Sequence, residues 1–186
     1  MIKLLKSCKI KKTTKIDKYF FGMPVGPNEA VIGLGHKRYT LVDLQNLQWL
    51  TQYRWHVGGN HKNRNDQGYV CRYEGEKLIY MHREIMGVAA DKQIDHINGN
   101  TFDNRKCNLR VSTQQQNTQN ACKHRLSSSK SKGVSWHKYN RKWRARIGHN
   151  KKEIHLGSFT NEVETAVAYD NAARKIFGEF ARLNFA

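Results

Sequence analysis

The sequence has few acidic residues for its length. Asp and Glu number 15 against 33 Lys and Arg, so the formal net charge is +18. Solubility needs much less charge, which makes a polyanion the first partner to consider. A disordered basic tail is excluded, because 38% of the 186 residues are hydrophobic and the chain has 4 Trp, 8 Tyr and 7 Phe. We expect one ordinary folded domain or two small ones.

Cysteine is scarce and scattered. Cys8, Cys71, Cys107 and Cys122 form no CxxC pair, which excludes the usual zinc ribbon and a disulfide framework. We therefore expect free thiols in a reducing compartment, and an intracellular protein that is not secreted.

Long apolar runs are also missing. Lysines interrupt the opening segment, unlike a signal peptide, and no stretch approaches the ~18 apolar residues of a membrane span. On charge alone, a basic amphipathic protein that binds a membrane surface is an alternative. The aromatic residues, however, follow strand-like alternation rather than one helical face. We therefore expect nucleic acid, and no membrane, as the partner.

The N-terminal part predicts a basic arm followed by a strand-rich scaffold. Residues 1–29 open with seven lysines and one acid before residue 19, and show no clean period. Alternating apolar residues then indicate short strands, turn formers and two short helices. The expected strands are 30–34, 37–42, 69–73 and 77–81, and the expected helices lie near 44–53 and 82–87.

A change in composition marks a domain boundary. The run RLSSSKSK, from Arg125 to Lys132, offers almost nothing to bury, which is typical of a linker. No internal repeat relates the parts on its two sides. The expected division is a first domain over 30–124 with its chemical core near 80–122, a linker over 125–131, and a second domain over 132–186.

Asp, His and Asn crowd the segment from residue 94 to residue 122. Its pattern indicates a strand, a loop with an Asn-Gly-Asn turn, a second strand, and a helix opened by a capping box of Thr113 and Gln116. The strand ends and the helix could then bring several polar groups into one small cavity. These groups are Asp95, His96, Asn108, Asn117 and, one helical turn later, Asn120.

The blocks Asp-His-Ile-Asn-Gly-Asn, Asp-Asn-Arg, Asn-Leu-Arg and Gln-Asn-Thr-Gln-Asn resemble the HNH endonucleases with a ββα-metal site. The resemblance implies that Asp95 and Asn117 hold one divalent metal and that His96 is the general base. It also implies that Asn108 orients His96 through its side-chain carbonyl, while Asn104 either shapes the loop or shares that role. The helix position is Asn where many members carry His, the variant found in phage homing endonucleases.

These residue types suit phosphodiester hydrolysis. An imidazole with a reference pKa near 6.5 can take the proton of a nucleophilic water at pH 7. A carboxylate and an amide oxygen are hard ligands, so we expect Mg²⁺, with Mn²⁺ as the alternative. Each residue taken singly is more often structural. Their order along one strand, turn, strand and helix favours a nuclease site.

A second pattern follows the linker. Trp143, Ala145 and Ile147 alternate with basic residues, so one face of a strand packs and the other is cationic. Two further strands are expected at 133–137 and 153–156, the latter with Ile154 and Leu156 inward. The helix that follows is expected to start at Thr160 or Asn161, to end at Gly178, and to carry an apolar stripe of Val163, Ala166, Val167, Tyr169, Ala173, Ile176 and Phe177.

The blocks Lys-Gly-Val-Ser-Trp, Lys-Trp-Arg-Ala-Arg-Ile and Leu-Gly-Ser-Phe resemble the plant APETALA/ethylene-response-factor DNA-binding domain. In that family the sheet lies in the major groove, where a β-ribbon fits. Ser135, Gly148 and His155 depart from the plant pattern, so the plant specificity is not carried over. A merely solvated charged face is the alternative. The expected DNA-contacting residues are Lys132, Ser135, Trp136, Lys138, Arg141, Lys142, Arg144, Arg146, Lys151, Lys152 and His155.

Together these patterns predict an α+β protein, with a ββα-metal HNH half joined to a three-stranded antiparallel sheet packed on one helix. The expected function is a metal-dependent DNA endonuclease of the homing type. It would act as a monomer on double-stranded DNA, without a small-molecule substrate, in the bacterial cytoplasm if phage-encoded. Two alternatives stay open: a non-catalytic sequence-specific regulator with a decayed nuclease half, and an RNA-directed nuclease, although no RNP aromatic signature is present.

Overall fold

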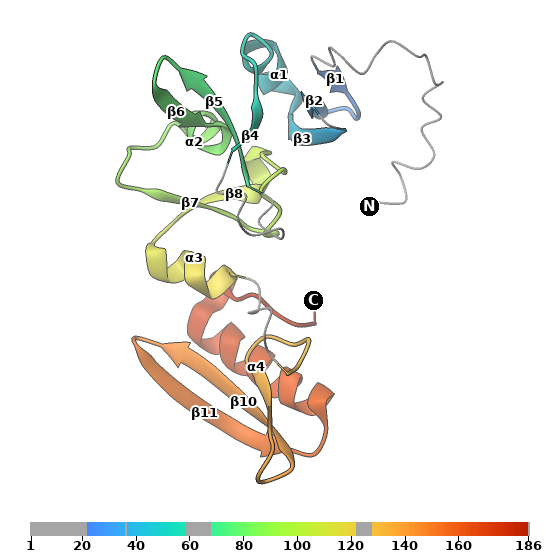
Figure 1. The fold of residues 1–186 in the computed structure, drawn as a ribbon, viewed down its shortest axis with the longest axis vertical. Coiled ribbons are helices and arrows are strands. Elements are labelled where there is room, and N and C mark those ends of the chain that lie inside the picture. The colour runs from blue at the N-terminus through green and yellow to red at the C-terminus, as the bar shows by residue number, and fades with distance from the viewer. Residues whose placement is uncertain (1–21, 36, 59–67, 122–127, 186) are drawn as a thin grey trace. The chain divides into compact units, whose positions relative to one another are not determined.

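The computed structural model describes residues 22–35, 37–58, 68–121 and 128–185 (Figure 1). Its helices and small antiparallel sheets make an α+β fold, as predicted. The chain forms two compact units. The first contains the chain up to Gly87 together with Thr101–Cys107, and the second contains Val88–Asn100 together with Asn108–Ala186.

The described residues of the first unit form two three-stranded sheets and two short helices. Short strands make up most of the described elements of this unit, which confirms the predicted strand-rich scaffold. The elements are β1 (Met23–Pro24), β2 (Glu29–Gly35), β3 (Arg38–Asp43), α1 (Leu44–Leu50), β4 (His56–Gly58), β5 (Tyr69–Glu74), β6 (Lys77–Tyr80) and α2 (Met81–Met86).

Segment Thr101–Cys107 belongs to the first unit because it packs beside β3. The backbone N–H of Leu41 donates to the carbonyl of Phe102, and the N–H of Asn104 donates to the carbonyl of Leu41, both at 2.8 Å. The Arg105 guanidinium pairs with Asp103 at 2.7 Å and also with Glu29. Strand-like pairing and a charge network therefore fix this segment.

The second unit begins with the hairpin and helix predicted between residues 94 and 122. Strand β7 (Gln93–His96) pairs antiparallel with β8 (Leu109–Ser112), and α3 (Gln114–Asn120) follows, with the 3-10 turn η3 (Lys106–Asn108) before β8. Thr113 accepts from the N–H of Gln116, and the Gln116 side chain accepts from the N–H of Thr113. The predicted capping box is confirmed, and it fixes where α3 starts.

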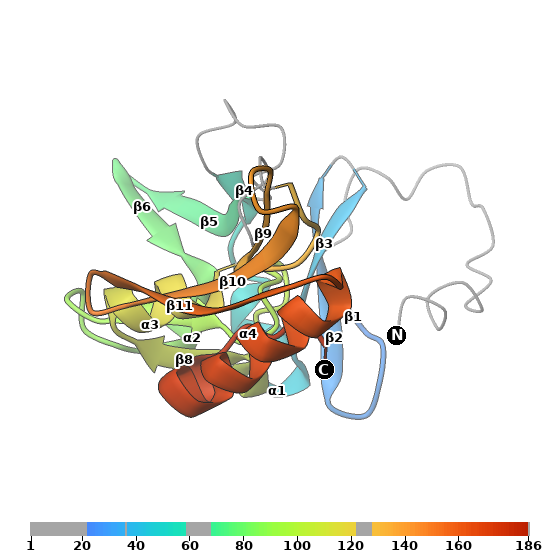
Figure 2. The ribbon, with the colours of Figure 1, turned by 90° about the horizontal axis from the view of Figure 1, so that it is seen from below.

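The rest of the second unit is a three-stranded antiparallel sheet packed on one helix, as predicted. The sheet runs in the order β11 (Lys152–Phe159), β10 (Lys142–His149), β9 (Val134–His137), and it is covered by α4 (Glu162–Phe177) (Figure 2). Its core joins Ile147 of β10 to three residues of α4, which are Tyr169, Ala173 and Phe177. The short turn η4 (Gly178–Phe180) ends the last helix.

Three details of this part differ from the sequence prediction. Val163 and Val167 are 57% and 43% exposed, so they do not belong to the buried stripe of α4. Ile154 is 40% exposed rather than inward. Ile154 is paired with the buried Ile147 and so lies on the same face of the sheet, but it belongs to the edge strand β11.

Residues 1–21 of the predicted arm and 125–127 of the predicted linker lie outside the described residues. Within the described part of the linker, Ser128 accepts from the N–H of Trp136 at 2.9 Å. Ser129 is buried and donates to Glu162 at 2.6 Å. Residues 128–131 are thus bonded to the C-terminal sheet and helix.

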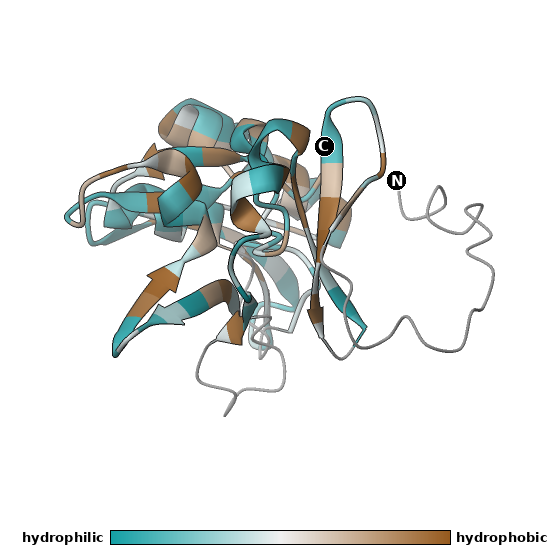
Figure 3. Cartoon of the chain, turned by 90° about the horizontal axis from the view of Figure 1, so that it is seen from above, coloured by the Kyte–Doolittle hydropathy of each residue, from teal (hydrophilic) through white to brown (hydrophobic). Residues whose placement is uncertain are grey.

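No described helix has both the length and the apolar character required to cross a membrane. Hydrophobic and hydrophilic residues are interleaved along the elements in Figure 3. This interleaving is what alternating burial on strands and one-sided burial on helices require.

Candidate active site

Asp95 and His96 end β7 as neighbouring buried residues. Their exposed fractions are 5% and 4%. Because successive side chains of a strand point to opposite faces, the two groups face different sides of the β7–β8 hairpin. The sequence placed both at the end of this strand, and the structure agrees.

Arg110 of β8 stands directly opposite Asp95 in the hairpin register. Its Nε and Nη2 atoms donate to Asp95 Oδ2 at 3.0 and 2.8 Å. The two side chains are 12% and 6% exposed, so the ion pair is shielded from water. Sequence analysis missed this partner of Asp95. The sequence did contain an indication of this pair, because Arg110 carries the opposite charge and lies in the strand expected to pair with that of Asp95.

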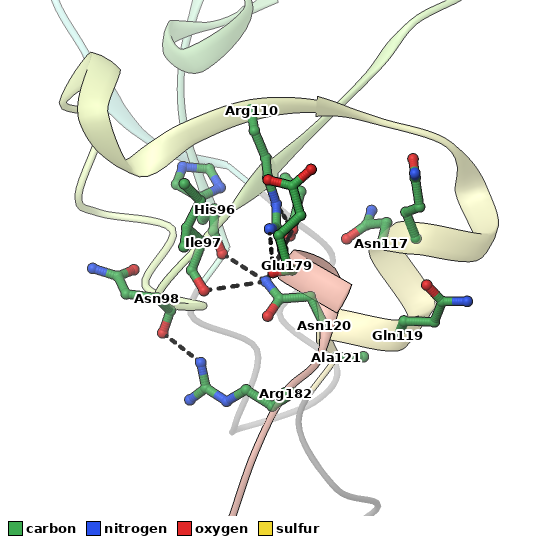
Figure 4. A network of polar contacts seen from close by, with 12 residues as sticks. His96, Ile97, Asn98, Arg110, Asn117, Gln119, Asn120, Ala121, Glu179 and Arg182 are labelled. Atoms are coloured by element: carbon green, nitrogen blue, oxygen red, sulfur yellow. Dashed lines mark hydrogen bonds and ion pairs between the residues drawn. The ribbon is translucent and has the colours of Figure 1, made fainter. Parts of the chain in front are cut away.

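Asn120 joins α3 to the end of β7. Its Nδ2 atom lies 3.0 and 2.9 Å from the two carboxylate oxygens of Asp95. It also lies 2.9 Å from the carbonyl oxygen of His96 and 3.3 Å from that of Ile97 (Figure 4). Asn120 is buried. A single amide therefore holds the last turn of α3 against the strand end.

Asn117, the predicted second metal ligand, lies one turn earlier on α3 and is half-buried. Its Nδ2 atom donates to Gln93 Oε1 at 3.4 Å, a long hydrogen bond. Both asparagines of α3, Asn117 and Asn120, were named from the sequence. Only Asn120 bonds to Asp95.

Asn108 bonds to the loop that follows His96. Its Oδ1 atom accepts from the N–H of Asn98 at 3.0 Å, and its Nδ2 atom donates to Asn98 Oδ1 at 3.1 Å. The carbonyl of Asn108 accepts from the N–H of Ile97 at 2.8 Å. These contacts shape the turn beside His96, and the predicted orienting contact with the imidazole stays a prediction.

Asn104 lies in the first unit and is fully buried. Its Nδ2 atom donates to Thr40 Oγ1 at 2.8 Å and to the carbonyl of Thr101 at 3.3 Å. These contacts favour the loop-shaping role over the catalytic one.

The predicted DNA-contacting residues lie on or beside the C-terminal sheet. Arg146 is already engaged, since its Nη1 atom bonds to Glu153 at 2.8 Å and its Nη2 atom to Ser135 Oγ at 3.3 Å. The side chain of Arg144 makes no hydrogen bond or ion pair with any described residue, although its backbone is paired within the sheet. The exposed members of the predicted set are Trp136, Lys138, Arg141, Lys142, Lys151, Lys152 and His155.

Positive charge on this sheet also acts on His137. The pKa of His137 lies below its ordinary value of 6.5, first because of partial desolvation and then because of the charges of Arg144 and Arg146. The electrostatic potential here disfavours a further proton. It favours an anion.

Lys132 does not sit on the exposed face. Its Nζ atom donates to the carbonyls of Gln119 and Ala121, at 2.5 and 2.7 Å, where α3 ends. Cations stabilise helix C-termini through the unpaired carbonyls there. Its contacts therefore favour a structural role over the predicted contact with DNA.

A metal at this site would need amide or backbone oxygens among its ligands. The described residues contain no group of three or more His, Cys, Asp and Glu that could hold a metal ion. Asp95 with an asparagine of α3 supplies a carboxylate and an amide, a donor set of hard oxygens.

Comparison with known proteins agrees with the predicted blocks. A family model described as HNH endonuclease matches residues 87–119, which contain β7, β8 and most of α3. A stretch of about 60 residues is similar to plant proteins. APETALA2-like protein 2 of Oryza sativa subsp. indica is 52% identical over 60 residues, which is 31% of this chain and 14% of that protein. An AP2-like ethylene-responsive transcription factor of Arabidopsis thaliana is 42% identical over 59 residues, again 31% of this chain and 17% of that protein.

One relative extends over the whole chain. An HNH endonuclease of Acanthamoeba polyphaga mimivirus is 30% identical over 196 residues, and the alignment covers 98% of each protein. Since both parts of the chain are included in this similarity and the family model falls on the buried Asp95–His96 hairpin, the chain belongs to the HNH endonuclease family.

Proposed function

We propose that this protein is a metal-dependent DNA endonuclease of the homing type. In this proposal Asp95 and Asn117 bind the metal, His96 is the general base, and the C-terminal sheet brings the nuclease site to its target. The observation that carries the proposal is the β7–β8–α3 arrangement, in which the buried Asp95 side chain bonds to Asn120 of a capped helix and the buried His96 is its neighbour in the strand.

The surroundings of Asp95 suit a hard divalent cation. Oδ2 accepts from Arg110 twice and from Asn120, whereas within the described residues Oδ1 accepts from Asn120 alone. A carboxylate has about four lone-pair sites, so Oδ1 keeps acceptor capacity. Asn117 directs its Nδ2 atom to Gln93, which turns its oxygen away from Gln93. Asp95 and Asn117 would therefore be the ligands.

The metal would stabilise charge on the phosphate and on the departing oxygen. His96 would accept the proton of the attacking water, and its burial keeps the imidazole out of bulk solvent. The Asn98–Asn108 hydrogen bonds would hold the loop next to His96 in one conformation. Mg²⁺ is the expected ion, with Mn²⁺ as a substitute.

The C-terminal sheet supports DNA as the substrate. Its exposed basic residues and the depressed pKa of His137 describe a positive surface, and the plant proteins that resemble it carry names of transcription factors. A surface of this charge binds phosphates, and arginines of a sheet can also pair with guanine. We infer that the sheet selects where the nuclease cuts.

Plasmid cleavage tests the proposal. Supercoiled plasmid should be nicked or linearised by the full-length protein with Mg²⁺, and should remain intact when EDTA replaces the metal. His96→Ala protein, purified in the same way, is the control for contaminating nucleases. Cleavage by that variant at the wild-type rate would contradict the assignment of His96.

The second candidate is a DNA-binding regulator that does not cut. The similarity of part of the chain to a protein named as a plant transcription factor favours it. Wild-type protein that shifts DNA in a gel but leaves plasmid intact with Mg²⁺ and with Mn²⁺ would establish this candidate instead. A parallel assay with single-stranded and duplex RNA separates the third possibility, an RNA-directed nuclease.

A further inference from the structure

Three contacts tie the β7–β8–α3 segment to the C-terminal sheet and helix inside the second unit. Each joins a basic side chain to a backbone carbonyl. Arg110 Nη1 donates to the carbonyl of Glu179 at 2.7 Å, and Arg182 Nη1 donates to the carbonyl of Asn98 at 2.9 Å. Lys132 Nζ donates to the carbonyl of Ala121 at 2.7 Å, where α3 ends. Figure 4 shows the contact between Arg182 and Asn98 beside His96.

Arg110 is the central member of this set. Two of its donors are used by Asp95 and a third by Glu179. Its guanidinium also lies over the ring of Phe180, 3.9 Å from the centroid. The fork of an arginine is planar and rigid, so these partners determine its orientation together.

Phe180 and Glu179 are in turn held by the C-terminal residues around them. Phe177, just before η4, is part of the C-terminal core. After η4, the backbone N–H groups of Asn184 and Phe185 each donate at 2.9 Å to the buried carboxylate of Asp170 on α4. The segment that touches Arg110 is therefore fixed at both ends.

A second basic contact reinforces the loop after His96. Gly99 adopts φ +72, and a Cβ atom there would lie 3.3 Å from Arg182 Nη1. Arg182 thus packs closely against the turn that Asn98 and Asn108 shape. Contacts from the C-terminal segment reach both sides of the Asp95–His96 pair.

We propose that Arg110 is a positioning residue whose guanidinium, held by the Glu179 carbonyl and the Phe180 ring, sets the carboxylate of Asp95 for metal binding. The C-terminal part is then a structural component of the nuclease site as well as a targeting module. This inference rests on the proposed function, because Asp95 must be a metal ligand. Partners of a ligating carboxylate commonly change metal affinity by about 10–100-fold when they are removed.

The first test uses Phe180→Leu, with Phe185→Leu as the matched control. Phe180→Leu keeps an apolar side chain and changes no charge, and it removes only the ring beneath Arg110. Phe185 lies five residues further along the same segment, and its side chain is 45% exposed. We expect Phe180→Leu to weaken Mn²⁺ binding about three- to tenfold, as the loss of a partly buried cation–π contact allows. Phe185→Leu should bind Mn²⁺ as the wild type does.

Mn²⁺ binding is measured by titration calorimetry without DNA, so the result does not depend on cleavage. Hydrogen exchange without metal gives a second readout, in which β8 amides should exchange faster in Phe180→Leu and not in Phe185→Leu. Gel-shift affinity in EDTA should be the same for both variants, because neither side chain belongs to the basic face of the sheet.

Arg182→Gln is the second variant, used whether or not Phe180→Leu folds. Arg174→Gln is its control, because Arg174 is exposed on α4 and its bond goes to the carbonyl of Phe185. We expect faster exchange in the loop after His96 and a higher Mn²⁺ requirement for Arg182→Gln alone. Equal metal binding and equal exchange across all four variants would overturn the proposal.

Failure of the proposed function gives a different result. Wild-type protein that binds Mn²⁺ but never cuts DNA refutes the nuclease proposal, and the binding comparison still decides the role of Phe180. Wild-type protein that binds no Mn²⁺ refutes the assignment of Asp95 as a ligand, and with it this inference.

Discussion

The side-chain amide of Asn120 lies within 3.0 Å of both carboxylate oxygens of Asp95. It also lies 2.9 Å from the carbonyl of His96 and 3.3 Å from that of Ile97, so one buried group contacts four acceptors from three consecutive residues. Asn117, one turn earlier, makes a single long bond to Gln93. Two asparagines of one short helix therefore have separable roles.

Asn120→Ala should lower stability, whereas Asn117→Ala should not. Removing Asn120 leaves the buried carboxylate of Asp95 and the carbonyl of His96 short of a donor, which costs about 1–3 kcal/mol. Asn117→Ala should abolish metal-dependent cleavage with little change in melting temperature. Thermal denaturation and plasmid cleavage of the two variants, side by side, measure this difference. If both melt like the wild type, the network around Asp95 does not stabilise the fold.

His96→Ala should reduce single-turnover cleavage by at least about 100-fold, because a general base lowers the barrier of the chemical step. DNA affinity, measured by gel shift in EDTA, should stay within a few fold of the wild type. A variant that loses both cleavage and affinity would indicate that His96 supports the fold rather than the chemistry.

Arg144→Ala and Arg146→Ala should affect DNA binding differently. Arg144 has no ion-pair partner among the described residues, whereas Arg146 is bonded to Glu153 and Ser135. If Arg144 contacts a phosphate, its loss should reduce the slope of log K against log salt by about 0.9. Arg146→Ala should give a smaller change, because Arg146 must first leave Glu153. Unchanged affinity and slope in both variants would mean that the face is merely solvated.

DNA binding should strengthen as the pH falls from about 7 to 6. In the free protein the charges of Arg144 and Arg146 help to hold the pKa of His137 below 6.5. Phosphates placed beside these arginines would raise that pKa, so the complex takes up a proton and low pH favours it. Binding titrations at both pH values should show the effect, and His137→Gln should remove it. The folding stability of the free protein should change in the opposite direction. Because the pKa of His137 is lowered in the folded state, protonation at low pH favours the unfolded state and stability falls.

Local signals made parts of this fold predictable. A capping box needs only Thr113 and Gln116, three residues apart along the chain, and α3 begins where they indicate. The alternation of Ala145 and Ile147 likewise identified the packed face of β10, and both are buried. Features of this kind depend on neighbours in sequence, so one sequence is enough to find them.

Features set by tertiary packing were not predictable in the same way. Val163 and Val167 fit an apolar stripe, but the sheet covers the face of α4 that carries Ala166, Tyr169 and Ala173. The Arg110–Asp95 pair depends on the β7–β8 register across a long loop, and Arg110 also needs Glu179 from 69 residues away. Asn117 was favoured over Asn120 because resemblance to a family identifies ligands but not the groups that hold them.

The chain passes between its two compact units more than once, because Thr101–Cys107 returns to the unit formed by the chain up to Gly87. The bonds of that segment to Leu41 and Asp43 are non-covalent links that a break in the backbone would leave intact. A single nick in the exposed stretch Ala89–Lys92 would therefore not release the N-terminal fragment. Two separately expressed fragments, divided there, are expected to reassemble by complementation into one working protein.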